Sequence, residues 1–425
     1  MTETTHHPRL AEESTPEPVD WVREHEDRAA ELLLELLSFD TQNPPGRTGE
    51  IADWIEGRFD DWGLETDRVV SEPAKPNLVT TLQGERDETV LFNGHLDTVP
   101  FHAGRWSRDP LGERDDDRIF GRGATDMKGP VASLLLTANA FAATDTTPPF
   151  TLQFALVADE ETGGPAGTET LLERDAVDPD VCVVAETTSA PERRSVTVAE
   201  RGRLWLTLEA TGQAAHGSRP MLGVNAIDRL DDAIEDCRAV LEDLDLSIDP
   251  QMESVIEESV EYYAPAMGRE TARSLFEQPT ANLGTFNGGD AINSVPERAV
   301  AELDVRLTPS VDPSAVLTTV GDVLEDHDRV SVREVSSTAG TYESQDSPVI
   351  DPAVEATRQV TGDRVYRRCA SGGSDARLFR NEGVPTVELG LGHGNAHSTD
   401  EYTTTDTLVG NAAVYTLLPY RCGQN

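Results

Sequence analysis

Histidines and carboxylates that could hold a metal ion recur directly after apolar, strand-like segments of this sequence. In TVLFNGHLDTVP, His95 and Asp97 end such a segment, and their i, i+2 spacing places both side chains on one side of a strand. Glu160 and Glu161 follow a second segment in TLQFALVADEETGG, and Glu186 follows a third in VCVVAETT. Open α/β sheets bind ligands at the carboxyl ends of their parallel strands. We therefore expect these side chains to gather at one edge of a sheet.

Two further motifs supply candidates of the same chemical types. GRGATDMKGP offers Asp126 in a glycine-flanked loop before a helix, and GLGHGNAHSTDEY offers His393 and His397 after the last strand-like segment. Each candidate has a purely structural alternative: Asp126 as a helix N-cap, Glu186 as a solvated strand end, and His393 as a loop residue. Histidine and carboxylate ligands together are typical of sites for zinc and related metals.

The composition of the 425-residue chain narrows its possible partners and surroundings. The 35 lysines and arginines are opposed by 78 acidic residues, which gives a formal charge of −43. We interpret this charge as adaptation to a very salty cell interior, because salt screens the mutual repulsion of the acids. Nucleic acid is not expected as a partner, since little here would neutralise phosphates. The four cysteines are far apart and form no CxxC pair, which argues against a disulfide framework and a cysteine zinc site.

The chain contains no apolar stretch of 18 residues, so we expect no membrane span. The N-terminal residues lack the charged and apolar regions of a signal peptide, and we expect a cytoplasmic protein.

Apolar strand-like segments that alternate with helical segments predict an α/β fold with a mostly parallel sheet and helices on both faces. From about residue 194 the pattern changes to longer alternating strands and a helix, which predicts an inserted small α+β domain with an antiparallel sheet. The predicted organisation is a disordered tail over 1–20, a catalytic metal-binding domain over 21–193 and 310–425, and an inserted lid or dimerisation domain over 194–309. The segment 247–280 has no clear pattern.

Eight motifs together carry a family resemblance that covers the chain from about residue 25. They read GHLDTVP, GRGATDMKG, DEETGG, AETT, AAHGSRP, NSVPERAVAELDVR, SGGSDAR and AHSTDEY. The sequence resembles the co-catalytic zinc amidohydrolases and peptidases that include acetylornithine deacetylase, succinyl-diaminopimelate desuccinylase, aminoacylase and the glutamate carboxypeptidases. The resemblance implies two divalent metal ions per chain, expected to be zinc, with cobalt or manganese as substitutes. It also implies a homodimer formed through the inserted domain and a small-molecule substrate with a free carboxylate.

The resemblance assigns two kinds of role at the centre of the site. Five residues are implied as metal ligands. His95 and Glu186 would bind one ion, Glu161 and His397 would bind the other, and Asp126 would bridge both ions. Three residues are implied as catalytic. Glu160 would be the general base, Asp97 would orient the His95 ring through its other nitrogen, and His216 would reach an active site, often that of a partner subunit, to support the oxyanion.

Three more residues match positions that contact the substrate in the family: Asn293, Arg306 and Arg377. An arginine suits a carboxylate because its planar guanidinium donates hydrogen bonds to both oxygens at once. The alternatives remain open at this point. Arg306 could be a salt-bridged strand residue, and Asp375, beside Arg377, could simply cap the helix that starts there.

The sequence thus predicts a metal-dependent hydrolase that cleaves the amide bond of N-acyl amino acids. A dipeptidase or carboxypeptidase acting on small peptides is the nearest alternative, because the same metals and base serve both reactions. More remote alternatives are a binding protein that lost its chemistry on the same fold, and acidic clusters that merely bind solvent cations in high salt.

Overall fold

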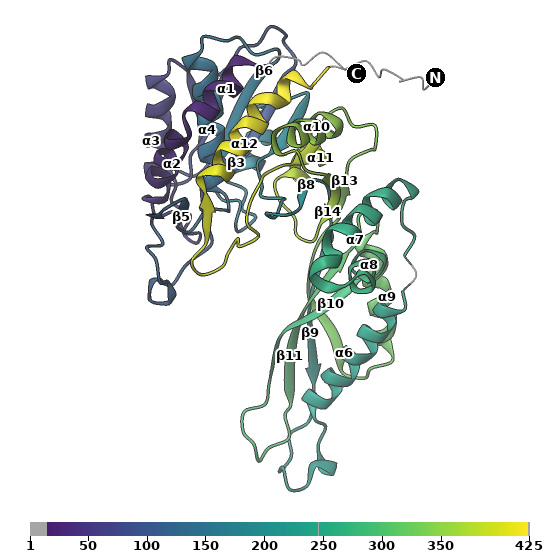
Figure 1. Cartoon of the computed structure of the whole chain (residues 1–425). Helices are drawn as coiled ribbons and strands as arrows, with labels where there is room; N and C mark the ends of the chain where they lie inside the picture. The colour runs from purple at the N-terminus through teal and green to yellow at the C-terminus, as the bar shows by residue number, and fades with distance from the viewer. Residues whose placement is uncertain (1–14, 245, 424–425) are drawn as a thin grey trace, which may run out of the picture.

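The computed structural model describes residues 15–244 and 246–423. The predicted tail over 1–20 lies for the most part outside these residues. Its last part is wrong, because helix α1 (Glu17–Glu24) begins inside it and buries Val19 and Val22. Figure 1 shows a large α/β unit and a smaller elongated unit that extends from one side of it.

The large unit is built on a nine-stranded sheet whose order is β1-β2-β6-β3-β7-β15-β8-β13, with β14 paired to β8. The run β6-β3-β7-β15 at its centre is parallel, which confirms the predicted fold class. The strands are β1 (Thr66–Val69), β2 (Asn77–Leu82), β3 (Thr89–His95), β6 (Thr151–Val157), β7 (Val181–Val184), β8 (Arg194–Glu200), β13 (Thr341–Tyr342), β14 (Val365–Ala370) and β15 (Thr386–Glu388).

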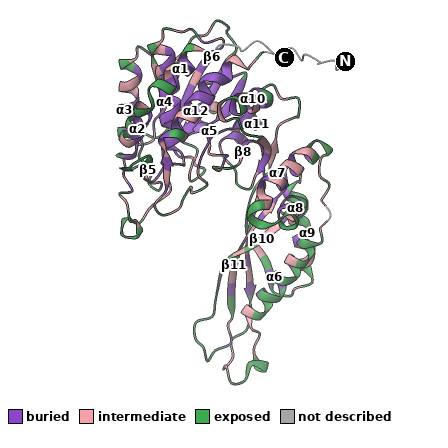
Figure 2. Ribbon diagram, in the orientation of Figure 1, coloured by how far each residue is buried: buried purple, intermediate pink, exposed green. Residues whose placement is uncertain are grey.

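Helices cover both faces of this sheet, because the central strands are apolar on both sides. Helix α4 (Lys128–Ala143) is buried along almost its whole length between the sheet and its helical neighbours, as Figure 2 shows. The same face carries α1, α2 (Glu26–Leu37), α3 (Gly49–Asp61), α10 (Ile350–Thr361) and α12 (Thr405–Leu417). The opposite face carries α5 (Thr168–Glu173) and α11 (Ala376–Asn381).

The smaller unit is a four-stranded antiparallel sheet of order β10-β11-β9-β12. Its strands are β9 (Gly202–Thr211), β10 (Thr280–Gly288), β11 (Arg298–Leu307) and β12 (Val330–Thr338). Burial alternates along β9 and β11, since only one face packs against α6 (Ala226–Glu242) and α9 (Pro313–Glu325). The opposite face of this sheet carries polar and charged side chains.

The predicted limits of the inserted domain, 194 and 309, differ from the observed strand pairing. Residues 253–277 return to the core of the large unit, so the chain crosses between the units more than twice. The outermost crossings lie near Gly202 and Gly340, because strand β8 belongs to the large sheet and β12 to the small one. These crossings touch each other: a Cβ on Gly202 would lie 2.7 Å from the backbone nitrogen of Gly340. Local alternation marks a strand but does not reveal which sheet it joins.

The segment 247–280, which the sequence pattern left uninterpreted, forms α7 (Glu253–Met267) and α8 (Arg269–Glu277). Their apolar side chains, including Val260 and Phe276, belong to the core of the large unit. The remaining elements are the small sheet β16-β5-β4, from β4 (Glu113–Asp115), β5 (Arg118–Phe120) and β16 (Tyr402–Thr404), and the short helices η1 (Ala103–Arg105), η2 (Pro220–Leu222), η3 (Pro250–Met252) and η4 (Leu418–Tyr420).

In the part of the chain that the structure describes, no helix combines the length and apolar character needed to cross a membrane.

Candidate metal centre

Three neighbouring strands deliver the first candidates to one edge of the large sheet. Strand β3 lies between β6 and β7, and all three run parallel. His95 is the last residue of β3, and the acidic run that contains Glu160 and Glu161 follows β6. Glu186 follows β7 after one further residue. The order of the strands therefore brings together side chains that are far apart in the sequence, as expected.

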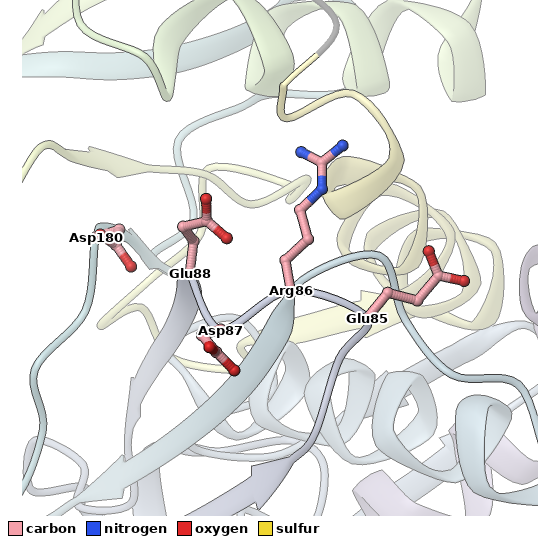
Figure 3. A pocket seen from close by; sticks show the side chains of 5 residues that line it. All are labelled: Glu85, Arg86, Asp87, Glu88 and Asp180. Atoms are coloured by element: carbon pink, nitrogen blue, oxygen red, sulfur yellow. The ribbon is translucent and has the colours of Figure 1, made fainter.

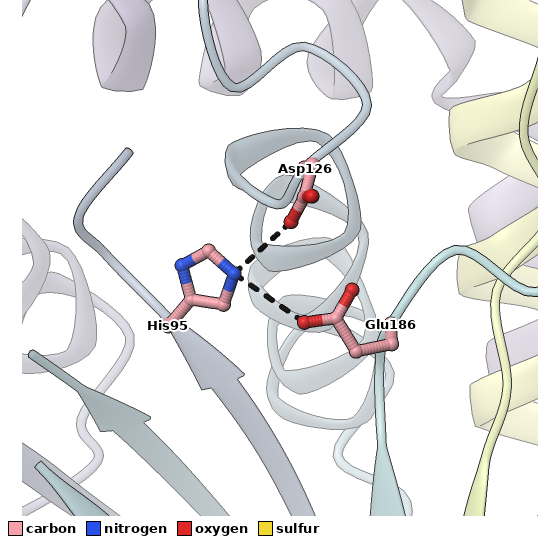
Figure 4. A group of neighbouring side chains, drawn as sticks. All are labelled: His95, Asp126 and Glu186. Atoms are coloured by element: carbon pink, nitrogen blue, oxygen red, sulfur yellow. Dashed lines mark hydrogen bonds and ion pairs between the residues drawn. The ribbon is translucent and has the colours of Figure 1, made fainter. Parts of the chain in front are cut away.

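Asp126 joins this edge from the loop that precedes α4. The Nε2 atom of His95 lies 3.1 Å from Asp126 Oδ1 and 3.4 Å from Glu186 Oε1. Figure 4 shows these three side chains pointing toward one another, with one nitrogen of the His95 ring facing both carboxylates. One donor atom from each of the three residues can be chosen so that all lie within 4.8 Å of one another.

A second group forms around the other oxygen of Asp126. His397 Nε2 lies 3.0 Å from Asp126 Oδ2 and 3.3 Å from Glu161 Oε2. The donor atoms of these three residues again lie within 4.8 Å of one another. The structure thus gathers five predicted metal ligands into two groups that share Asp126.

The donor atoms of both groups fit divalent metal ions. The Nδ1 atom of His95 lies 3.0 Å from the carbonyl oxygen of Asp97; when Nδ1–H donates there, the Nε2 lone pair faces the carboxylates. Burial lowers the pKa of His95, but the carboxylates of Asp126 and Glu186 outweigh burial and raise it well above its usual value. Hydrogen bonds to Asp126 and Glu161 raise the pKa of His397 to about 10. The carboxylates that raise these pKa values would also attract a metal cation placed between them and the histidine nitrogens.

Asp97 orients its surroundings in a different way from the one expected. The backbone carbonyl of Asp97 faces the His95 ring, whereas its carboxylate Oδ1 lies 3.7 Å from His95 Nδ1. The carboxylate instead accepts hydrogen bonds from the backbone N–H groups of Glu160 and Glu161, both at 3.2 Å. Asp97 therefore fixes the turn that presents these two acids, which is a role that motif spacing did not reveal.

Glu160 lies beside both groups. Its Oε2 atom is 3.9 Å from His95 Nε2, and its side chain is 16% exposed. Burial raises the pKa of Glu160 well above its usual value, and the negative charges of Asp375, Glu186 and Glu161 act in the same direction, while His95 opposes them. A carboxyl group with a raised pKa next to a metal centre is suited to accept and release a proton.

Two supporting residues lie within quoted motifs, but the sequence analysis gave them no role. Glu401, from AHSTDEY, is fully buried and accepts hydrogen bonds from the backbone N–H groups of Thr125 (2.7 Å) and Asp126 (3.0 Å). It also forms a buried ion pair with Arg122, from GRGATDMKG. Arg122 in turn donates to the carbonyl oxygen of His397 at 3.2 Å. This pair fixes the backbone of two candidate ligands, Asp126 and His397.

A further polar group lies behind Asp97. Asn43 Nδ2 donates to Asp97 Oδ2 at 2.8 Å and to Asp159 Oδ1 at 2.9 Å. Lys75 pairs with the same oxygen of Asp159 at 2.5 Å. Asp159, the first acid of the DEE run, is thus engaged by Asn43 and Lys75 and has a supporting role.

The structure leaves four predicted site residues apart from the histidine–carboxylate groups. His216 lies in the small unit, where its Nδ1 accepts a hydrogen bond from the Ser218 backbone N–H. The backbone of Asn293 lies beside it, accepting from the N–H of Gly217. Within the described residues of this chain, neither side chain makes a hydrogen bond or ion pair with the two groups.

The other two are arginines. Arg306 pairs with Asp304 on its own strand at 2.8 Å, and Arg377 Nε lies 4.0 Å from Glu200 Oε1. Asp375 precedes helix α11, but its carboxylate accepts from the Thr168 hydroxyl instead of capping the helix. His393 is a loop residue whose ring contacts the Thr407 hydroxyl, outside both groups.

The hollow shown in Figure 3 is not this site. It has a volume of about 590 Å³ and is lined by Glu85, Arg86, Asp87, Glu88 and Asp180. Its residues precede β3 and β7, so it lies at the amino ends of the strands whose carboxyl ends carry the candidate ligands.

The parallel sheet, the ligand groups at its carboxyl edge and the adjacent acid define a metal-dependent hydrolase. The sequence of residues 91–421 matches the model of peptidase family M20/M25/M40. The chain belongs to this family, which confirms the resemblance seen in the motifs.

Known proteins agree with this assignment. The chain is 31% identical over 373 residues to acetylornithine deacetylase of Edwardsiella ictaluri, covering 86% of this chain and 88% of the relative. It shares the fold of the M20 family metallo-carboxypeptidase Sso-CP2 from Sulfolobus solfataricus, with a TM-score of 0.76, 20% identity, and coverage of 92% and 99%. It also shares the fold of the Bacillus subtilis YXEP protein, a dinuclear metal-binding M20 peptidase, with a TM-score of 0.63, 14% identity, and coverage of 93% and 98%.

Proposed function

We propose that this chain is an amidohydrolase that removes the acyl group from N-acyl amino acids. The observation that carries the proposal is the sharing of Asp126 between two histidine–carboxylate groups, with the Glu160 carboxylate 3.9 Å from His95. The likeness to a protein named acetylornithine deacetylase supports an acyl amino acid as the substrate.

His95, Asp126 and Glu186 would hold one divalent ion, and Asp126, Glu161 and His397 the other; zinc suits these donors. When bound, two such ions would supply an activated water and an electrophile that polarises the scissile carbonyl. Glu160 takes the proton of the attacking water and passes it to the leaving nitrogen. Its raised pKa allows the carboxyl to keep the proton between these two events.

The small unit would supply the groups that recognise the rest of the substrate. Arg306 and Arg377 are suited to a substrate carboxylate, and Asn293 would contact the substrate next to them. His216 would stabilise the oxyanion in the site of a partner subunit, because within its own chain it makes no contact with the metal groups. The active form would then be a homodimer joined through the small unit. We also propose a cytoplasmic enzyme adapted to high salt, which the charge of −43 supports.

A dipeptidase or carboxypeptidase is the second candidate, favoured by the likeness to a metallo-carboxypeptidase. The same ligands and base would cleave a peptide bond. A binding protein without catalysis is less well supported, because Glu160 and all five candidate ligands are present.

The test is hydrolysis in molar potassium chloride with added zinc, cobalt or manganese. The panel pairs N-acyl amino acids with dipeptides, each also with a blocked C-terminus. We expect cleavage of acyl amino acids with a free carboxylate. Preference for dipeptides would establish the second candidate, and cleavage of blocked substrates would contradict the roles of Arg306 and Arg377. A protein that retains two transition metals but hydrolyses none of the substrates would be the binding protein. Loss of those metals on dialysis would indicate that the acidic clusters merely bind solvent cations.

A further inference from the structure

Two arginines lie directly opposite each other in the small sheet. Arg203 of β9 and Arg306 of β11 are register partners in adjacent antiparallel strands. Side chains in such a pair start about 5 Å apart and share one face of the sheet, so like charges there are destabilising. Two opposed positive charges are unexpected in a chain with 78 acidic residues, because an acid opposite either arginine would form an ion pair instead.

Arg306 has a carboxylate partner, but Arg203 does not. Asp304 pairs with Arg306 and also accepts a hydrogen bond from the indole of Trp205. Among the described residues, no carboxylate oxygen lies within ion-pair distance of Arg203; its guanidinium is stacked over the Trp205 ring at 3.9 Å. The Nε atom of Arg203 is buried and has no hydrogen-bond partner within the same described ranges.

A third arginine approaches from the large unit. Burial lowers the pKa of Arg203, and the positive charges of Arg306 and Arg377 lower it further. Geometry places Arg377 near the start of β9, since its Nε atom lies 4.0 Å from Glu200 Oε1 and Glu200 precedes Arg203 by three residues. Arg377 belongs to α11 of the large unit, so the three arginines come from both sides of the junction between the units.

That face is hollowed next to the arginine pair. A groove of about 430 Å³ is lined by residues of all four strands, among them Trp205, Asp304 and Ser336. Trp205 and Asp304 are register partners, and each lies two residues along its strand from Arg203 or Arg306, on the same face of the sheet. An anionic group that reached the arginine pair would therefore have space beside it.

We propose that Arg203, together with Arg306 and Arg377, forms an anion site that receives a second carboxylate of the substrate, so that the enzyme prefers dicarboxylic substrates. This rests on the proposed hydrolysis of a substrate that already carries one carboxylate. One arginine can hold one carboxylate through two parallel hydrogen bonds. Asp304 is the close counter-charge of Arg306, and Glu200 lies beside Arg377. Arg203 has no carboxylate within ion-pair distance among the described residues, so its guanidinium is the one left for the second carboxylate. The second carboxylate belongs either to the acyl group or to the amino-acid side chain.

The experiment compares acids with their uncharged amides of nearly the same shape. One pair is N-succinyl-alanine and N-succinamoyl-alanine, which tests the acyl half; the other is N-acetyl-glutamate and N-acetyl-glutamine, which tests the amino-acid half. The wild type should prefer the acid at least tenfold in kcat/KM in one of the pairs, because a hydrogen bond to a charged group discriminates to about that extent or more. Arg203→Gln should reduce this preference to near unity, and Arg203→Lys should retain part of it.

Arg298→Gln is the matched control. Arg298 lies at the other end of β11, on the same face, and pairs with Glu209. It should leave the acid preference unchanged. No acid preference in the wild type, or an equal loss on acids and amides in Arg203→Gln, would overturn the anion site and leave the proposed hydrolysis intact.

A binding measurement makes the test independent of turnover. Calorimetry with glutarate and its half-amide, on the metal-loaded wild type and Arg203→Gln, should show tighter binding of glutarate only when Arg203 is present. Equal binding by both proteins would refute the site even if none of the four substrates were hydrolysed. Arg203→Gln should fold with an equal or higher Tm, since it relieves repulsion between Arg203 and Arg306; a large loss of stability would indicate a structural role instead.

Discussion

Replacement of Glu160 by glutamine should separate catalysis from structure. Within the described residues, the Glu160 carboxylate accepts no hydrogen bond, and its nearest ion-pair contact is His95 at 3.9 Å. The substitution therefore removes a proton acceptor without removing a structural contact. General base catalysis contributes about 10²- to 10⁴-fold, so kcat should fall by that factor, equivalent to about 3–5 kcal/mol in the activation barrier.

The fold should become more stable in the same variant. Burial and three neighbouring carboxylates raise the pKa of Glu160, so the charged form is less favourable in the folded chain than in the unfolded one. The uncharged amide removes this cost at pH values above the ordinary pKa of a glutamate. Chemical denaturation of the metal-free protein at pH 8, in molar potassium chloride, should show a larger free energy of unfolding for Glu160→Gln than for the wild type.

Glu161→Gln is the matched contrast, because the neighbouring acid should bind metal instead of moving protons. We expect Glu160→Gln to retain two metal ions per chain and Glu161→Gln to retain fewer after dialysis, measured by atomic emission. Metal loss in Glu160→Gln, or a kcat within a few fold of the wild type, would refute the division of roles between these adjacent residues.

Four other predictions address the surroundings of the site. His216→Ala and Glu160→Ala should each be inactive alone, but mixed dimers should regain activity if His216 acts in the partner's site; no recovery after co-refolding would contradict this. Glu401→Ala should cost about 3–5 kcal/mol of unfolding free energy, because it leaves Arg122 buried without its partner, and metal titration should show weaker binding. Burial raises the pKa of Glu200 to about 7, so the folded wild type binds this proton more tightly than the unfolded chain does. The wild type should therefore lose on the order of 3 kcal/mol of unfolding free energy as pH rises from about 4.5 to 7. Glu200→Gln should remove this loss, which denaturation curves at several pH values would measure. Finally, dilution into low salt should unfold the wild type as screening of the −43 charge is lost, and circular dichroism that stays unchanged would contradict the proposed adaptation.

The catalytic edge was predictable because it depends on few physical facts. Apolar runs give strands, parallel strands bring their carboxyl ends together, and acids directly after such strands must then meet. His95 and Glu186 illustrate this, since their strands are adjacent in the sheet. The chemistry of these side chains favoured metal binding and proton transfer. The motifs and their order then added Asp126 and His397, the candidate ligands from distant loops.

The supporting contacts were not predictable in the same way. Nothing in the spacing of GHLDTVP tells that the Asp97 carboxylate accepts from the backbone of Glu160 and Glu161. Glu401 was hidden by composition, because one acid among 78 carries little information until its burial is known. The domain limits were missed for a related reason: pairing partners of β8 and β12 are set by tertiary contacts, which local alternation does not encode.

The position of the outermost chain crossings, near Gly202 and Gly340, connects these observations to substrate binding. The Glu200 carboxylate, just before the first crossing, accepts from the backbone N–H of Ser374 at 2.9 Å, and the Thr341 hydroxyl, just after the second, lies 3.2 Å from the same carboxylate. The loop before α11, the helix that carries Arg377, is thus fastened to the segments that join the two units. Arg203 lies three residues beyond Glu200, in the small unit, so the angle between the units sets the distance from Arg203 and Arg306 to the metal groups. A substrate that contacts both the arginines and the metal groups would therefore bind best at one angle between the units. The crossings would in this way help to select substrates by length and charge.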